Sequence, residues 1–132
     1  MFVRSGVFIL LAFQSLAVLA HHWVNQVYDE HSLVSLEVVV QEFRFINPHP
    51  FIAVVLADAD DSDIWTLEMD NRWELADLGI TADTLRNGDL IRISANPSPF
   101  NDRALYIRSF EHPRLNFRYE HNVRRLFELG EE

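Results

Sequence analysis

The run SLVSLEVVVQEFRFI, residues 32–46, constrains the fold more than any other part of the chain. It is rich in β-branched and aromatic residues, and apolar side chains recur at every second position. In its first part these are Val34, Leu36, Val38 and Val40. This period predicts a long strand with one buried face. From Phe43 onward the apolar residues occupy the other parity, which indicates a β-bulge near Glu42.

The rest of the pattern predicts four more strands and one short helix. The expected strands are residues 51–57, 64–69, 90–94 and 104–110. Asn71 is suited to cap a helix that Gly79 ends, and Asn87-Gly88 forms a turn before the fourth strand. Three strands, a helix and two strands is the order of the OB-fold, a small five-stranded Greek-key barrel. The sequence therefore predicts an all-β domain with one short helix; a half-open sandwich is the competing topology.

The first twenty residues have the layout of a secretory signal peptide. Arg4 is followed by the apolar run 7–13 and by small residues up to Ala20. This run is short for a membrane span, although an uncleaved anchor is the alternative. We expect a bacterial periplasmic or secreted protein without a stable membrane span after processing. The expected division is 1–20 signal peptide, 21–112 OB-like barrel and 113–132 C-terminal extension, and a cut that leaves Val18 first is the other option.

The charge balance is acidic. The chain has 20 Asp and Glu against 11 Lys and Arg, and a formal net charge of -9. Removing residues 1–20 takes away Arg4 and no acid, so 10 basic and 20 acidic residues leave -10. Because phosphate binding depends on clustered Lys and Arg, we expect no nucleic acid partner. With no cysteine in the chain, the fold must rely on packing alone or on packing and a bound metal.

Two histidines would begin the mature chain if the signal peptide is cut after Ala20. The amino group and ring of His21 can then chelate Cu(II), and nitrogen ligands suit this ion. His49 is the expected third ligand, because the prolines around it stiffen the turn Asn47-Pro48-His49-Pro50, and His22 is a spare. The alternative is that the N-terminal pair is solvated and that the His49 ring caps a backbone group.

The remaining polar residues carry weaker expectations. His31, His112 and His121 lie in loop or tail sequence, where solvated histidines are expected. The acidic stretch 58–63 lacks the glycine and glutamate of an EF-hand, so we interpret it as a solvated turn. Glu68 is expected on the outer face of its strand, pairing with Arg92 or Arg108, or lining a cleft with Asn47 and His49.

Several of these motifs together resemble a family of short exported bacterial proteins of unknown function. They are His21-His22, Asn47-Pro48-His49, the strand Trp65 to Glu68, and the turn Thr84 to Asp89. The resemblance implies a small OB-like barrel exported to the periplasm, and it implies no known activity. This chain departs from the family in having Trp23 after the histidine pair and a longer tail.

The leading functional interpretation is a periplasmic, non-catalytic binding or accessory domain with copper as its candidate ligand. No nucleophile and base stand in a recognisable pattern, and there is no glycine-rich phosphate loop. Two alternatives stay open: a copper-dependent redox enzyme that uses the same nitrogens, and a structural or protein-interaction module of the cell envelope. The partner is then a small ligand, a metal ion or an envelope protein.

Overall fold

The computed structural model describes residues 24, 26–59 and 63–121. A helical turn at residues 24, 26 and 27 precedes the first strand. The elements that follow are β1 (Val34–Arg44), β2 (Phe51–Leu56), β3 (Trp65–Glu68), α2 (Arg72–Asp77), β4 (Leu90–Pro97), β5 (Ala104–His112) and β6 (Phe117–Glu120). None of the helical segments in the described residues is long and apolar enough to cross a bilayer.

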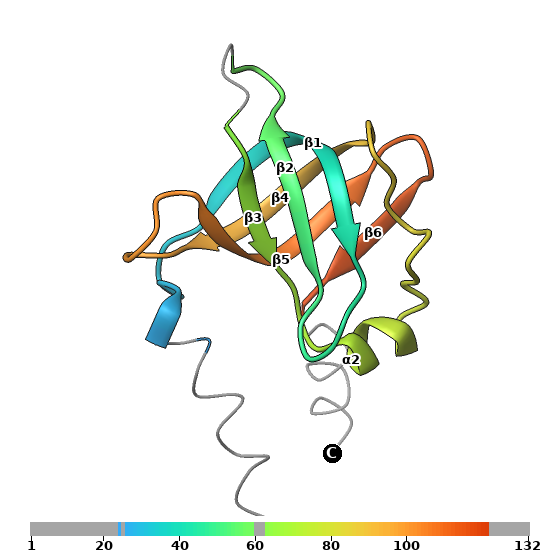
Figure 1. The fold of residues 1–132 in the computed structure, drawn as a ribbon, viewed down its shortest axis with the longest axis horizontal. Helices are drawn as coiled ribbons and strands as arrows, with labels where there is room; N and C mark the ends of the chain where they lie inside the picture. The colour runs from blue at the N-terminus through green and yellow to red at the C-terminus, as the bar shows by residue number, and fades with distance from the viewer. Residues whose placement is uncertain (1–23, 25, 60–62, 122–132) are drawn as a thin grey trace, which may run out of the picture.

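The strands form one sheet in the order β3-β2-β1-β4-β5-β6. β3 also pairs with β5, in parallel, and this pairing closes the first five strands into a barrel. The helix α2 comes between β3 and β4 and lies at one end of the barrel, beside the β1–β2 connection (Figure 1). This is the OB-fold topology, so the predicted fold class is confirmed.

The bulge in β1 explains how one strand serves two neighbours. β1 pairs with β4 through residues 34–39 and with β2 through residues 38–44, and its register with β2 shifts between Val40 and Glu42. Val38 and Val40 are fully buried before the shift, and Phe43 packs against the core after it. The bulge thus keeps apolar side chains inside the barrel as the strand bends, as the change of parity predicted.

The barrel interior is aliphatic and aromatic. Side chains with no exposed surface come from every strand of the barrel and from α2, among them Val54, Leu67, Leu75, Ile91 and Ile107. Each such side chain contributes roughly 1.5–3 kcal/mol when it is removed from water. Because the chain has no disulfide, this core supplies most of the stability.

The local signals at α2 and in the turn before β4 act as expected. The Asn71 side chain accepts a hydrogen bond from the Glu74 amide at 3.0 Å, which caps the helix. Gly79 follows the helix with φ 84°, and Gly88 has φ 87° in the Asn87-Gly88 turn. Both φ values lie in the region where a side chain is strained, which accounts for glycine at these two positions.

The turn before β4 is attached to the barrel by a buried charge cluster. Asp89 is 5% exposed; its carboxylate accepts from the Arg86 amide at 2.8 Å and from Arg114 at 2.7 Å. His112, at the end of β5 and 1% exposed, places Nε2 3.1 Å from the same carboxylate. The expectation that His112 is solvated is therefore wrong, because His112 is the last residue of β5, paired with Phe117 of β6, and is not part of a loop.

The sheet continues beyond the fifth strand. β6 pairs with β5 from Phe117 opposite His112 to Glu120 opposite Ser109, within the range expected to be a C-terminal extension, 113–132. His121 follows β6 with only 11% of its side chain exposed, so the expectation of a solvated residue is wrong here too. The expected signal peptide 1–20, residues 60–62 of the acidic turn and residues 122–132 of the expected extension lie outside the described residues.

Candidate functional site

Two carboxylates project from the outer side of β3 as it runs toward α2. Leu67 and Met69 are fully buried, while Glu68 and Asp70 are only partly buried. Side chains alternate along an extended chain, so these two carboxylates lie on the same side, two residues apart. Each carboxylate contacts one histidine and one tyrosine.

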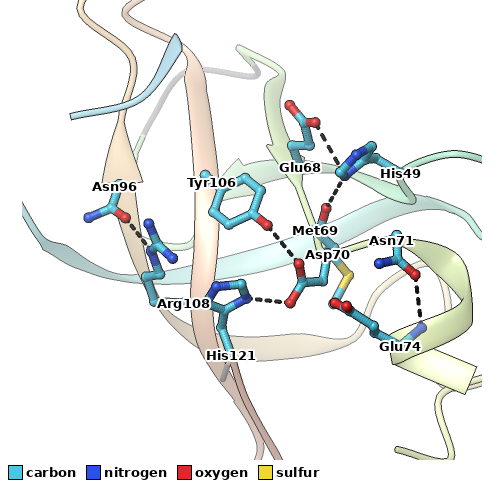
Figure 2. Close-up of polar contacts among 10 residues, drawn as sticks. All are labelled: His49, Glu68, Met69, Asp70, Asn71, Glu74, Asn96, Tyr106, Arg108 and His121. Carbon is cyan, nitrogen blue, oxygen red and sulfur yellow. Dashed lines mark hydrogen bonds and ion pairs between the residues drawn. The ribbon is translucent and has the colours of Figure 1, made fainter. Parts of the chain in front are cut away.

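We call the first group the Glu68 set, which consists of Glu68, His49 and Tyr28. The second, the Asp70 set, consists of Asp70, His121 and Tyr106. Figure 2 shows the Asp70 set and the two residues Glu68 and His49 of the first set around the end of β3. The histidines and tyrosines come from segments far apart in the chain, and β3 brings them together.

His49 is held in one orientation by the backbone. Its Nδ1 lies 2.9 Å from the Met69 carbonyl oxygen and 3.6 Å from a Glu68 oxygen (Figure 2). A carbonyl oxygen can only accept, so Nδ1 is the donor. In the neutral ring the second nitrogen, Nε2, then carries the lone pair. This is the arrangement in which a backbone acceptor fixes the tautomer of a metal-binding histidine.

The turn that carries His49 is also bound through its main chain. The Met69 amide donates to the Pro50 carbonyl at 3.0 Å, and the Arg72 amide donates to the Pro48 carbonyl at 3.1 Å. The peptide bond between Asn47 and Pro48 is cis. The turn therefore lies against the end of β3 and the start of α2, and 21% of the His49 side chain is exposed.

Tyr28 joins the segment before β1 to this site. Its hydroxyl donates to Glu68 Oε2 at 2.7 Å, and its ring packs on Tyr106 with 5.4 Å between centroids. Burial and the neighbouring Glu68 carboxylate raise the Tyr28 pKa, so the phenol stays protonated and continues to donate. The segment is attached again just downstream, where the Asp29 amide donates to the Pro97 carbonyl at 2.8 Å.

The Asp70 set is tightly packed. Tyr106 donates to Asp70 Oδ1 at 3.0 Å, and His121 Nδ1 forms an ion pair with Oδ2. Burial opposes ionisation of Asp70, but the hydrogen bond and charge of His121, with the Tyr106 hydroxyl, outweigh it and lower the Asp70 pKa. The His121 ring stands edge-on to Tyr106 at 5.7 Å, and Arg108 lies over the Tyr106 ring at 5.0 Å. This set joins β3, β5 and the end of β6.

The sequence-based site residues have different places in this structure. Glu68 pairs with Tyr28, and the expected arginine partners are engaged elsewhere: Arg92 with Glu37, and Arg108 with Asn96. Asn47 is exposed in the turn beside His49. His21 and His22 lie outside the described residues. Within the described part of the chain, no three His, Cys, Asp or Glu side chains are grouped so that they could hold a metal ion.

Four residues of the two sets were not singled out from the sequence: Tyr28, Asp70, Tyr106 and His121. The one signal for Tyr106 was a polar-tipped aromatic residue inside an apolar strand, since buried tyrosine hydroxyls usually find a partner. Asp70 follows an apolar strand directly, which is ordinary for a strand end. Tyr28 and His121 lie 40 and 51 positions from their carboxylate partners in the chain, so no local pattern connects them.

Comparisons with known proteins identify a family and several similar solved structures. Residues 9–104 match DUF6152, described as a family of unknown function. No curated protein matches the chain. Two crystal structures of the mitochondrial single-stranded DNA binding protein Rim1 from S. cerevisiae are similar. The first is 16% identical, with TM-score 0.45, and the match covers 61% of this chain and 91% of Rim1. The selenomethionine-labelled form is 11% identical, with TM-score 0.42 and coverages of 69% and 97%.

These structures correct one expectation. The exclusion of nucleic acid, drawn from the net charge, is overturned by the finding that similar solved structures are single-stranded DNA binding proteins. Net charge is a sum over the whole chain, whereas a nucleic acid groove depends on local charges and on aromatic stacking, so the sum excludes nothing. At such low identity the likeness concerns the fold and assigns no ligand. The family match spans more than half of the chain, which therefore belongs to DUF6152.

Proposed function

We propose that this member of DUF6152 is an exported, non-catalytic binding domain that takes up Cu(II) between its mature N-terminus and His49. The observation that carries the proposal is the His49 ring, whose Nδ1 donates to the Met69 carbonyl at 2.9 Å. With Nδ1 occupied, the ring offers Nε2 to a ligand, from a turn that is held by main-chain hydrogen bonds at both of its prolines. The ligand nitrogen is thus positioned before the metal arrives.

The attachment of Tyr28 supports a contribution from the N-terminus. Its hydroxyl is 2.7 Å from Glu68, and the other oxygen of Glu68 is 3.6 Å from His49 Nδ1. His21 lies seven positions before Tyr28 in the chain, and an extended chain covers about 3.3–3.6 Å per position, or roughly 25 Å in total. The chain length therefore allows the terminal amine and ring of His21 to reach His49.

Nitrogen chemistry favours Cu(II) among the common divalent ions. After cleavage behind Ala20, the amine and imidazole of His21 form one chelate and His49 adds a third nitrogen, with His22 as the substitute for either imidazole. Three nitrogens of this kind suit a tetragonal Cu(II) ion. Because the described residues do not supply three grouped ligands themselves, the site depends on the N-terminus being free.

Copper titration of a chain that begins at His21 tests the proposal. We expect one Cu(II) per chain by calorimetry, and an electron paramagnetic resonance spectrum with nitrogen hyperfine structure. His49→Ala should weaken binding by at least about tenfold. His31→Ala is the matched control, because His31 is an exposed histidine close in sequence to Tyr28. Equal affinity in the wild-type and His49→Ala proteins would remove His49 from the site.

Processing is tested separately. Mass spectrometry of the protein exported from a bacterial host should give an N-terminus at His21, and acetylation of that amine should weaken Cu(II) binding. A mature chain that starts at Val18 would contradict the chelate, since the first amine would then belong to a residue without a metal-binding side chain. Turnover of oxygen with a reductant by the copper-loaded protein would favour the redox enzyme over the binding domain.

A further inference from the structure

We infer that β6 is the surface through which two copies of this chain associate, edge to edge, as a two-fold symmetric dimer. β6 is the last strand in the order of the sheet, and in the part of the chain that the structure describes it pairs with β5 alone. We call its other side the free edge. The main chain at such an edge is a template for a further strand.

The main chain of β6 shows which residues face the free edge. The amide of His121, directly after the strand, donates to the Arg108 carbonyl of β5 at 2.7 Å. In an antiparallel pair every second residue exchanges hydrogen bonds with the neighbouring strand, so Tyr119 is bonded to β5 in the same way. Arg118 and Glu120 therefore direct their amides and carbonyls toward the free edge.

Exposed side chains of the sheet carry alternating charges up to this edge. Cross-strand neighbours form a row from β1 to β6: Glu37, Arg92, Glu111 and Arg118. Arg92 pairs with Glu37 at 2.7 Å, and Arg118 pairs with Glu111 at 2.9 Å. Arg118 also contacts Glu120 of its own strand, and its five N–H donors leave room for another carboxylate. The free edge thus presents one positive and one negative side chain.

A two-fold axis through Tyr119 brings opposite charges together. It sets Arg118 of each copy opposite Glu120 of the other, so that the alternation of charge continues into the second copy. A register centred on Arg118 would set two arginines against each other, and one centred on Glu120 would set two glutamates against each other. Like charges directly opposite are destabilising, and a slip by one residue exchanges inner and outer side chains. The sequence of β6 therefore favours one symmetric register.

Charge reversal at these two positions tests the register. The strands have four residues each, so the contact is small and we expect a reversible dimer. Arg118→Glu and Glu120→Arg should each weaken self-association of the exported protein at least about tenfold, because both cross-strand pairs become like-charged. An equimolar mixture of the two variants should associate again, since the acidic edge of one chain then meets the basic edge of the other. Sedimentation velocity over a concentration series measures each case.

Arg103→Glu is the matched control. Arg103 lies just before β5, its side chain is 52% exposed, and it pairs with Asp63. Its reversal changes the net charge as much as Arg118→Glu does but leaves β6 intact. The dimer should therefore form with the affinity of the wild-type protein. A loss equal to that of Arg118→Glu would mean that overall charge, and not the free edge, governs association.

Hydrogen exchange locates the contact without a variant, so it holds even if a reversed chain folds poorly. The amides of Arg118 and Glu120 should exchange more slowly as the concentration of the wild-type protein rises. The Tyr119 amide, bonded to β5 within one chain, should stay protected at every concentration. Protection of Arg118 and Glu120 that does not depend on concentration would mean that the same chain covers this edge, and it would overturn the inference.

Two further results would overturn it. One is a wild-type protein that stays monomeric up to about 1 mM, a concentration that already corresponds to very weak binding. The other is a mixture of the two reversed variants that fails to associate although circular dichroism shows both to be folded. No copper is present in these experiments, so their failure leaves the proposed function untouched.

Discussion

Tyr106 on β5 donates a hydrogen bond of 3.0 Å to Asp70, the second residue after β3 ends at Glu68. This bond reinforces the parallel β3–β5 pairing that closes the barrel. We predict that Tyr106→Phe lowers the free energy of unfolding by about 1.5–3 kcal/mol, the range for a hydrogen bond to a charged group. Urea denaturation measures this loss. Phe100→Ala, at a side chain that is 79% exposed, should change stability by no more than about 0.5 kcal/mol.

Acid should destabilise the protein through Asp70 and Asp89. Burial acts to raise the pKa of both carboxyls, but hydrogen bonds and neighbouring charges outweigh it, so both pKa values are lowered. At Asp70 the main lowering group is His121. At Asp89 the lowering groups are the Arg86 amide, His112 and Arg114. A carboxyl with a lowered folded-state pKa stabilises the fold above its unfolded pKa of about 3.9 and loses that contribution as pH falls through the folded value.

We therefore predict that the free energy of unfolding falls steeply below about pH 4. Asp70→Asn should flatten this part of the profile, because one of the groups that binds a proton on unfolding is gone. Urea denaturation at pH values from about 2.5 to about 7, a range that spans the titration of a carboxyl, gives the two profiles. Identical slopes in the two proteins would contradict the role assigned to Asp70.

The buried cluster at Asp89 should be more sensitive than the surface ion pairs. Asp89→Ala removes the acceptor of the Arg86 amide and leaves His112, 1% exposed, without its carboxylate. We expect a loss of about 3 kcal/mol, as for breaking a buried pair. Glu37→Ala breaks an exposed pair with Arg92 and should cost less than about 1 kcal/mol. Thermal unfolding of both variants provides the comparison.

Gly88 should resist substitution for a reason of backbone conformation. Its φ is 87°, and an added Cβ would meet no atom within 4 Å. Gly88→Ala is therefore expected to lose about 1–2 kcal/mol from strain alone, and Gly88→Asn should lose less, because asparagine tolerates positive φ better. If the two variants were equally stable to urea, strain would not be the cause.

The sequence was sufficient for most of the fold. The change of parity at Glu42, the glycine turns at Gly79 and Gly88, and the Asn71 cap are all local signals, and each has its expected place in the structure. The order of the predicted strands and helix then indicated the OB-fold barrel. Expectation failed at His112 and His121, because their neighbours in the sequence are polar, whereas the burial of their rings depends on contacts that form only in the folded barrel.

Only part of the candidate site could be predicted from the sequence. His49 stood out because prolines flank it, and Glu68 because it lies on the polar face of an otherwise apolar strand. Their partners did not stand out, since Tyr28 contacts Glu68 from 40 positions away and Asp70 meets His121 only after the barrel has closed. Alternation and turn chemistry act between near neighbours, and so the sequence by itself determined the elements. Which carboxylate meets which tyrosine and histidine depends on how the strands pair, and only the tertiary structure decided that.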